Sequence, residues 1–321
     1  MPLRQSLAAF LCCSFIVGSA AAQAPAPGPD RTGWKLVWAD EFDGKVIDRT
    51  KWDFDLGNGF YNYDANQWIS GWGNEELQYY TNNPENAFLA DGELHIKAIK
   101  ESYLGSGYTS AKLKTRKRDG TALFAKQYGR FEWRAKLPLG KGVWPALWML
   151  PQDDAYGTWA ASGEIDVLES KGQEPNKIHG TIHFGGRWPA NAYKGKEYVF
   201  PEGQTIKDYH TYAVEWEPGE IRWYCDDRHY ATQTSWWSST KSDGNKGAKP
   251  TKEEELQPWP APFDKPFYLV MNVAVGGRFL GKPDATTKFP AELVVDYVRV
   301  YEREEPYGEA KARTPENLPF K

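Results

Sequence analysis

Short strand-like runs separated by turn residues are the feature that most limits how this chain can fold. Such runs occupy 94–98, 129–135, 178–184, 212–216, 221–224, 267–275 and 293–301, with Gly, Pro, Asn and Asp between them. The sequence lacks the longer period of an amphipathic helix. The segment 268–273 is apolar almost throughout, as in a central strand covered on both faces. The pattern predicts an all-β sandwich of many strands.

The first residues predict export. Arg4 precedes an apolar run over 7–17, and small residues follow at 19–22, which is the pattern of a cleaved signal peptide. The run is shorter than the roughly 18 residues of a membrane span, although an uncleaved N-terminal anchor is the alternative. We expect a signal peptide over 1–22, an Ala/Pro-rich leader over 23–33 and a secreted protein, extracellular or periplasmic, without membrane contact after cleavage.

Composition excludes several classes of protein. Cys12 and Cys13 lie in the predicted signal peptide, so Cys225 stands alone and a disulfide framework is excluded. The net charge of −4 gives no electrostatic reason to bind nucleic acid or an anionic membrane. The chain has 15 Trp, 18 Tyr and 15 Phe. Flat aromatic faces suit sugar rings, but large β-sandwich cores are also aromatic.

Three acids stand close together in the segment 163–169. Glu164 and Asp166 share one face of a regular strand because side chains alternate. Strict alternation would send Glu169 to the opposite face. One extra residue at Val167-Leu168, a β-bulge, would return Glu169 to the face of the other two acids. Ile165 and Leu168 would then point into the core.

Three acids on one face of a strand repel one another, which destabilises the fold unless a function requires them. Retaining glycosidases use a nucleophilic carboxylate and a protonated acid about 5–5.5 Å apart, and crowding of like charges raises the pKa of one of them. Clustered acids also bind calcium or magnesium, and a solvated strand edge needs no function at all. Spacing alone leaves these three interpretations open.

The segment Gly163 to Glu169 resembles the bulged E-x-D-x-x-E signature of glycoside hydrolase family 16, in its laminarinase-like branch. The resemblance covers about Trp34 to Tyr301. It implies a β-jelly-roll sandwich of two antiparallel sheets with an open concave groove, in which a polysaccharide chain is cut internally. It extends to the segments 38–42, 73–81, 142–151, 179–185, 212–216, 272–277 and 295–301.

The resemblance also implies roles for individual residues. Glu164 is expected to be the nucleophile, Glu169 the acid/base and Asp166 their assistant, in a retaining double displacement. The implied substrate is β-1,3-glucan, with mixed-linkage β-1,3/1,4-glucan as a further one. The residues expected to contact sugar are Asn74, Arg116, Trp144, Trp148, Trp159, His183 and Trp188.

Each of these binding residues has a plainer alternative. Core packing would account for the tryptophans, and Arg116 could be one more cation in a basic strand. His179 and His183 are too few for a zinc site, because no acid or cysteine at ligand spacing joins them.

The family resemblance further implies a structural calcium but no cofactor for catalysis. The matching positions are Glu41, Gly92 through its carbonyl, and Asp296. Oxygen ligands suit this hard cation, while the alternative is that Asp296 merely caps a turn.

One folded domain is expected over 34–303, and two segments depart from its strand pattern. The loop 235–262 has aromatic ends and a polar middle, and is long for a connection in a compact domain. It is therefore a functional or a mobile loop, and its ends predict packing near the cleft. The polar tail 304–321 is expected to be a loose end.

Several functions compete at this level. The leading one is an endo-β-1,3-glucanase, and a hydrolase of another β-linked polysaccharide such as agarose shares the acid motif. A transglycosylase is favoured if the loop 235–262 folds over the groove. A non-catalytic glucan-binding protein would lose the acids, and all three are present. We expect a monomer, because an open groove needs no partner to complete it.

Overall fold

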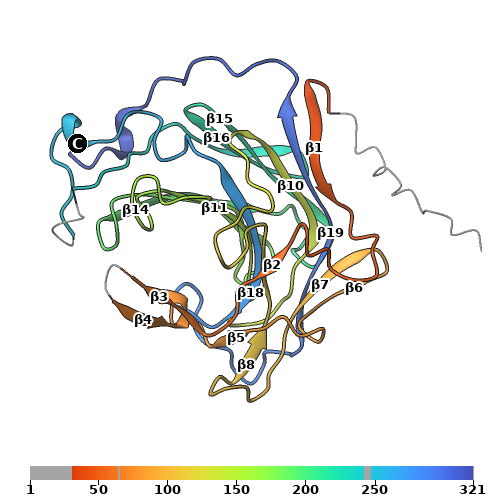
Figure 1. The fold of residues 1–321 in the computed structure, drawn as a ribbon. Coiled ribbons are helices and arrows are strands. Elements are labelled where there is room, and N and C mark those ends of the chain that lie inside the picture. Colours follow the sequence, from red (N-terminus) through yellow and green to blue (C-terminus); the bar gives the residue numbers. More distant parts are fainter. Residues whose placement is uncertain (1–30, 64–65, 242–246, 321) are drawn as a thin grey trace, which may run out of the picture. The chain divides into compact units, whose positions relative to one another are not determined.

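The computed structural model describes residues 31–63, 66–241 and 247–320, which form a β-sandwich (Figure 1). The strands and short 3-10 turns are β1 (Trp34–Asp40), β2 (Asp53–Phe54), β3 (Gly59–Asn62), β4 (Gln67–Ser70), η1 (Gly71–Gly73), β5 (Gln78–Tyr80), β6 (Ala87–Ala90), β7 (Glu93–Ala98), β8 (Tyr108–Ser110), β9 (Lys112–Lys114), β10 (Gly129–Lys136), β11 (Val143–Pro151), β12 (Glu164–Glu169), β13 (Lys177–Gly185), β14 (Asn191–Val199), β15 (His210–Glu217), β16 (Glu220–Cys225), β17 (Arg228–Gln233), η2 (Glu253–Glu255), β18 (Phe267–Val275), β19 (Ala291–Arg303) and η3 (Pro315–Asn317).

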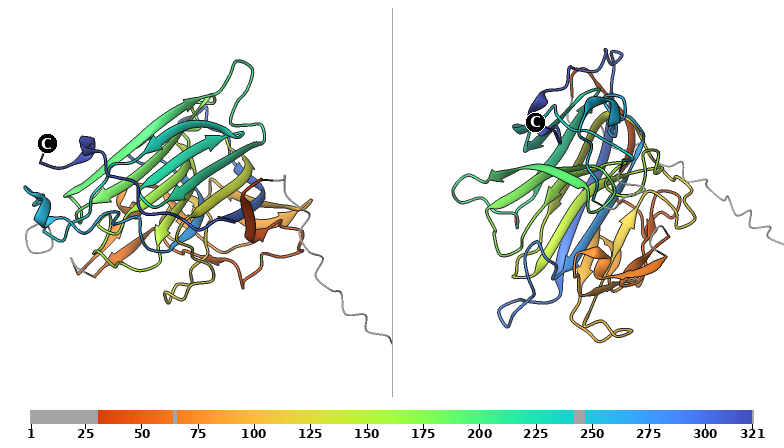
Figure 2. Two further views of the ribbon diagram at one scale, coloured as in Figure 1. Left: turned by 90° about the horizontal axis from the view of Figure 1, so that it is seen from above. Right: turned by 90° about the vertical axis from the view of Figure 1, so that its left-hand side faces the viewer.

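Two antiparallel sheets make up the sandwich, as the sequence predicted. The first, here the outer sheet, has the order β17-β16-β15-β10-β19-β7-β6, with β1 also paired to β19. The second, here the acid sheet, has the order β14-β13-β12-β11-β18-β9-β2. Figure 2 shows the two layers from two further directions. Two small pairs complete the fold: the β3–β4 hairpin, and β5 beside β8 in parallel.

The core lies between the sheets and absorbs much of the aromatic content. All nine residues of β18 are buried, which confirms the prediction of a central strand covered on both faces. Alternate β18 residues such as Met271 and Val273 belong to the core cluster. Asn272 and Tyr268 lie on the other side of β18, on the face of the acid sheet that is turned away from the core, here the acid face. The tryptophans in the core are Trp52, Trp133, Trp216, Trp223, Trp236 and Trp237.

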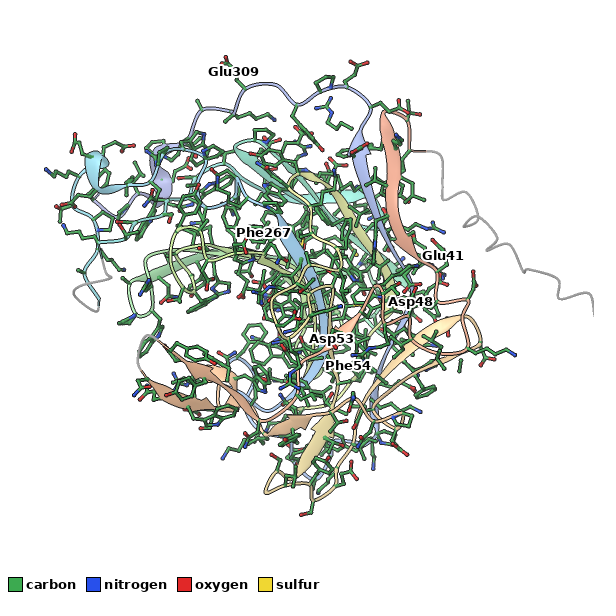
Figure 3. The ribbon with its side chains drawn as sticks, viewed as in Figure 1. Glu41, Asp48, Asp53, Phe54, Phe267 and Glu309 are labelled. Atoms are coloured by element: carbon green, nitrogen blue, oxygen red, sulfur yellow. The ribbon has the colours of Figure 1, made fainter. Side chains whose placement is uncertain are left out.

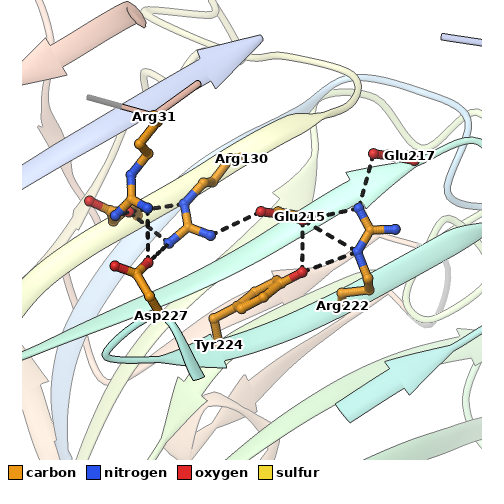
Figure 4. A network of polar contacts seen from close by, with 8 residues as sticks. Arg31, Arg130, Glu215, Glu217, Arg222, Tyr224 and Asp227 are labelled. Carbon is orange, nitrogen blue, oxygen red and sulfur yellow. Dashed lines mark hydrogen bonds and ion pairs between the residues drawn. The ribbon is translucent and has the colours of Figure 1, made fainter. Parts of the chain in front are cut away.

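A network of ion pairs crosses the outer sheet (Figure 4). Glu132 is fully buried and accepts hydrogen bonds from Arg130 Nε at 3.0 Å and from the Tyr297 hydroxyl at 3.0 Å. Arg31 also pairs with Glu132. Arg130 reaches Glu215 as well, which extends the network across β15. A buried carboxylate is tolerated only with such partners, so the network ties Arg31 to the sheet.

Replacing Glu132 by Gln is therefore expected to lower the free energy of unfolding by about 3 kcal/mol, because it removes the charge that compensates two arginines. Denaturant unfolding would measure the change. Glu302→Gln is the matched control: Glu302 forms a partly exposed pair with Lys126 at 3.2 Å, so its loss should cost below about 1 kcal/mol. Equal effects of the two substitutions would contradict a structural role for the buried network.

The aromatic residues at the start of the loop 235–262 pack into the core, whereas the sequence predicted packing near the cleft. Trp236 and Trp237 are buried in the core. Ser238 forms a parallel bridge with Gly185, and its hydroxyl donates to the Ala161 carbonyl at 2.6 Å. These contacts join the loop to the segment that precedes β12 and to the last residue of β13. The described parts of the loop therefore support the turns that flank the acid strand.

The tail after β19 is not a loose end, which corrects the expectation from its polar composition. Its backbone bonds to the body of the domain at Lys311, whose amide donates to Pro218, and at Thr314, whose amide donates to Thr234. Leu318 is buried. Figure 1 shows this segment running from the end of β19 over the sandwich. Backbone hydrogen bonds and one apolar anchor fix a segment that its charged side chains suggested would be free.

The predicted signal peptide 1–22 and most of the leader 23–33 lie outside the described residues. Within the described part of the chain, no helix has the length and apolar character required to cross a membrane. Cys225 is a buried free thiol, in agreement with the absence of a predicted disulfide partner.

Candidate active site

The acid strand β12 contains the predicted β-bulge. Leu168 pairs with Leu147 of β11, whereas Asp166 pairs with the next residue, Trp148. On the other side, Asp166 pairs with Thr181 and Glu169 with His179, so β12 has one residue more than β13 over this stretch. Val167 and Leu168 lie at this register shift, as predicted. Ile165 and Leu168 are buried in the core cluster, which confirms their predicted direction.

The opposite sheet holds the bulge in place. Trp223 of β16 donates a hydrogen bond from its indole nitrogen to the Asp166 carbonyl at 2.8 Å. Gly180 of β13 makes room for this indole, because a Cβ at position 180 would lie 2.3 Å from Trp223 Cδ1. The core thereby fixes the peptide group at which the strand changes register.

A second glycine begins the acid strand. Gly163 has a φ of +87°, and a Cβ there would lie 2.8 Å from the Phe263 ring. A residue with a side chain would be strained and would clash. The turn into Glu164 thus requires glycine and sets where the strand begins.

Tryptophan N–H groups hold both glutamates. Trp159 Nε1 donates to Glu164 Oε2 at 2.8 Å, and Trp144 Nε1 donates to Glu169 Oε1 at 3.1 Å. His183 lies beside Asp166 and Glu164, with its Nε2 3.4 Å from Asp166 Oδ2 and 3.8 Å from Glu164 Oε1. The structure therefore brings together the three predicted acids with Trp144, Trp159 and His183.

The electrostatics separate these groups into different protonation states. Burial raises the pKa of Glu169 to about 7, and the charge of Glu164 adds to the increase. Burial, followed by the charges of both glutamates, raises the pKa of Asp166 well above its usual range. Burial alone would lower the pKa of His183, but its hydrogen bond to Asp166 and the nearby carboxylates outweigh this and raise it to about 9. At neutral pH, His183 is a cation, and the pKa of Asp166 is shifted toward the protonated form.

The protonated state of His183 also bears on metal binding. Glu164, Asp166 and His183 are close enough in space to hold a metal ion, but a metal binds neutral imidazole. The cluster therefore fits proton chemistry better than metal ligation.

Trp148 lies on the acid face beside the acids. It pairs in register with Asp166, and its Nε1 donates to Asn272 Oδ1 at 2.7 Å. The Lys112 ammonium lies 4.9 Å from its ring centre. Trp148 and Trp144 are both partly exposed rather than part of the core, so the packing alternative does not account for them.

Trp188 is separated from the acids but adjacent to Trp159. Its side chain is 66% exposed, and its amide donates to the Trp159 carbonyl at 3.1 Å. This hydrogen bond fixes the backbone at Trp188 beside the segment that precedes β12. A role of Trp188 in sugar binding stays a prediction.

Asn74 belongs to a polar network that the sequence analysis did not identify. Its amide donates to Glu76 Oε1 at 3.2 Å, and the Tyr80 hydroxyl contacts Glu76 Oε2 at 3.5 Å. Asn272 donates to the Tyr80 hydroxyl at 3.0 Å and accepts from Trp148. Burial raises the pKa of Glu76. The run 73–81 contained these residues, but nothing in their spacing showed that they meet β18.

Arg116 lies at a turn after β9, away from the hydrogen bonds of the acid cluster. Its guanidinium carbon is 5.6 Å from the centre of the Tyr268 ring, and Tyr268 lies on the acid face. The Arg116 Nε has no hydrogen-bond partner among the described residues. A buried donor in this position is suited to a ligand hydroxyl.

The predicted calcium ligands have other partners. Both carboxylate oxygens of Glu41, which lies just beyond β1 (Figure 3), accept hydrogen bonds from Arg299 at 2.8 Å. Asp296 pairs with Arg134. Gly92 forms the β6–β7 turn near Asp43. Because arginines already neutralise both acids, this arrangement does not fit a calcium ion, and the calcium stays a prediction that requires both pairs to open.

Trp159 offers a direct test of the geometry. Replacing Trp159 by Phe keeps the aromatic ring but removes the N–H that holds Glu164. We expect kcat/KM on a cleaved polysaccharide to fall roughly tenfold, the worth of one hydrogen bond to a charged group. Steady-state kinetics would measure it, with the melting temperature as a check on folding. An unchanged kcat/KM would show that this hydrogen bond does not position Glu164.

Comparisons with known proteins show the family of the chain. The model of glycosyl hydrolases family 16 matches residues 81–252. The chain is 47% identical over 287 residues to glucan endo-1,3-beta-glucosidase A1 of Niallia circulans, covering 86% of this chain and 39% of that relative. It is 43% identical to beta-glucanase of Rhodothermus marinus, covering 85% of this chain and 88% of the relative.

A solved structure shows the same architecture. The laminarinase catalytic domain of Thermotoga maritima has a TM-score of 0.68 at 40% identity, covering 85% of this chain and 99% of that one. Fold and family match together define a glycoside hydrolase built on a two-sheet β-sandwich. The chain belongs to glycosyl hydrolase family 16, as the acid motif indicated.

Proposed function

We propose that the protein is a secreted, retaining endo-β-1,3-glucanase of the laminarinase type that cleaves internal bonds of a β-glucan. The observation that carries the proposal is the bulge in β12, which places Glu164 and Glu169 on one face with a pKa of about 7 for Glu169. The names of the relatives and of the solved neighbour support β-1,3-glucan as the substrate. Mixed-linkage β-1,3/1,4-glucan is a second proposed substrate.

The first chemical step uses the two glutamates in different protonation states. A carboxylate oxygen of Glu164 attacks the anomeric carbon, and the bond from that carbon to the glycosidic oxygen breaks. Glu169 gives its proton to the departing oxygen. The trapped sugar is then bound to Glu164 as an ester, and the other part of the chain leaves with a new hydroxyl.

The second step reverses the role of Glu169. Once Glu164 is esterified, it carries no charge, and the Coulomb contribution that raised the pKa of Glu169 disappears. Glu169 is then a carboxylate with a lowered proton affinity, which accepts a proton from the attacking water. The water oxygen bonds to the anomeric carbon and Glu164 is released. Two inversions leave the anomeric configuration unchanged.

Asp166 and His183 tune this exchange without touching the reacting bond. Burial and the charges of both glutamates raise the pKa of Asp166, so a third negative charge beside them is disfavoured. His183, as a cation beside Asp166 and Glu164, compensates the charge that moves between the two glutamates. Both are positioning residues, and we propose that catalysis needs no cofactor.

Product analysis tests the proposal. The purified mature protein would be incubated with laminarin, curdlan, lichenan and agarose, with Glu164→Gln as the control. Release of short β-1,3-gluco-oligosaccharides by the wild type alone supports the proposal. Products longer than the starting glucan chains would instead indicate a transglycosylase. Cleavage of agarose alone would indicate a different hydrolase. Binding to glucan without any cleavage would indicate a glucan-binding protein.

Export and a monomeric state are part of the same proposal. The predicted signal pattern at 1–22 supports export, and a polymer substrate too large to enter a cell gives a reason for it. Sequencing the N-terminus of the exported protein would test the cleavage site, which is expected after Ala22. Sedimentation analysis would test the monomer.

A further inference from the structure

The β3–β4 hairpin exposes large aromatic side chains away from the catalytic acids. Tyr63 is 86%, Trp68 52% and Tyr61 40% exposed. A two-stranded hairpin is at best marginally stable alone, so unsupported apolar surface there costs solubility without adding to a core. Concentrated exposed aromatic surface of this kind marks a binding site.

The two faces of the hairpin differ in their contacts, although Phe60 on the face that packs is itself 41% exposed. Phe60 and Ile69 are cross-strand partners on one face, and both lie within 4 Å of where a side chain on Gly73 would begin. The Phe60 ring is 6.3 Å from that of Trp72. Tyr61 and Trp68 are cross-strand partners on the opposite face, so the anchoring contacts leave their aromatic surface uncovered.

The anchor connects the hairpin to the acid face. The Lys112 ammonium lies 4.4 Å from the centre of the Trp72 ring and 4.9 Å from that of Trp148. Trp72 also packs against Tyr80, with ring centres 5.4 Å apart. Trp72 Nε1 is a buried donor without a hydrogen-bond partner among the described residues. Aromatic groups therefore continue from Trp148 past β9 to the hairpin.

The strand order of the acid sheet gives the distance between the acids and the hairpin. From β12, which carries the acids, the acid sheet continues through β11 and β18 to β9. Three strand spacings amount to about 14 Å, and the hairpin stands beyond them. Trp68 leans back toward the sheet, with its ring edge 4.0 Å from where a side chain on Gly57 would begin. A chain bound at the acids and extended across the strands would reach the hairpin after several sugar rings.

Resting on the proposed glucanase activity, we propose that Tyr61, Tyr63 and Trp68 form a remote platform that binds a β-glucan chain far from the cleavage point. The flat faces of the rings suit the axial C–H faces of pyranose rings, and the platform carries no charge that would select an ionic ligand. Its consequence is a preference for long chains. Only a chain long enough to span both sites gains the additional binding.

The test compares chain lengths in the full mature protein. We would measure kcat and KM on laminarin and on the shortest β-1,3-gluco-oligosaccharide that the wild type cleaves. Trp68→Ala is expected to lower kcat/KM on laminarin roughly tenfold, about 1.4 kcal/mol. The loss should appear in KM because the platform binds ground state and transition state alike. The shortest substrate should change by less than about twofold.

Two variants separate stacking from general surface effects. Trp68→Phe keeps a flat ring and should restore most of the loss. Leu104→Ala removes another large exposed apolar side chain, 70% exposed and outside the platform, and should leave both substrates unaffected. An equal loss of Trp68→Ala on long and short substrates, or no loss on either, would overturn the proposal. So would a wild-type dimer that Trp68→Ala dissociates, because a second copy would then be what covers this face.

Failure of the platform and failure of the glucanase proposal remain distinguishable. Binding of the Glu164→Gln variant to insoluble curdlan does not depend on cleavage. If the wild type cleaves no glucan, the glucanase proposal fails. Loss of curdlan binding on adding Trp68→Ala would still support the platform in that case, and unchanged binding would refute it.

Discussion

Replacing Glu164 by Gln is expected to reduce kcat on laminarin by at least about a thousandfold, because an amide cannot form the glycosyl ester. The substitution keeps the size of the side chain and an acceptor for Trp159, so the melting temperature should stay close to that of the wild type. Glu197→Gln is the matched control. It removes a carboxylate from β14, two strands away from β12, that pairs with Lys177 at 3.3 Å, and activity should stay within about twofold.

Glu169→Ala distinguishes the two glutamates from one another. On laminarin it should also lose most activity, since general acid catalysis contributes roughly 10²–10⁴-fold. On an aryl β-glucoside whose phenol leaves without protonation, the first step no longer needs the acid, and Glu169→Ala should form the glycosyl-enzyme at near wild-type rate. Glu164→Gln should not react with either substrate. If Glu164→Gln reacted with the aryl substrate while Glu169→Ala did not, the two roles would be reversed.

The second large effect concerns pH. With the Glu169 pKa at about 7, kcat/KM of the wild type should fall as pH rises through 7, because the acid loses its proton. The His183 cation lowers the pKa of Glu169. Replacing His183 by Gln removes that charge, raises the pKa of Glu169, and is expected to move the alkaline limb upward by about one pH unit.

Trp144→Phe provides a comparison for the pH profile. Trp144 donates to Glu169 Oε1 and lowers its pKa less than His183 does. Its removal should shift the alkaline limb in the same direction by a smaller amount. The measurement is kcat/KM against pH on one soluble substrate for the three proteins. A downward shift in His183→Gln would show that His183 does not act on Glu169 through its charge.

Much of the fold and the acid strand could be predicted from sequence because both depend on local pattern. Alternation and turn residues mark strands such as β10 and β18. The apolar positions Ile165 and Leu168 fix the bulge, since only an extra residue between Asp166 and Glu169 buries both. These signals lie within a few residues of one another, so they can be recognised in the sequence without knowledge of contacts between distant segments.

Contacts between distant segments could not be predicted in the same way. Glu76 contacts Tyr80, and Tyr80 meets Asn272 only after the segment around β5 is placed against β18. The spacing of these residues in the sequence carries no sign of this. Glu41 and Asp296 suggested a calcium site, but their arginine partners stand on strands whose register had first to be known. The tail likewise showed its charges in the sequence, whereas its backbone hydrogen bonds to Pro218 and Thr234 appear only in the fold.

The indole of Trp223, buried between the sheets, ends on the peptide group that turns the acid strand over. Because Gly180 has no side chain, the indole has room to reach this peptide group. A larger residue at 180 would displace the indole and remove the hydrogen bond to the Asp166 carbonyl that holds the bulge. The residues at positions 180 and 223 therefore affect catalysis through the bulge, although neither residue takes part in the reaction itself. Across descendants of this sequence, 180 and 223 should be exchanged together or remain as they are.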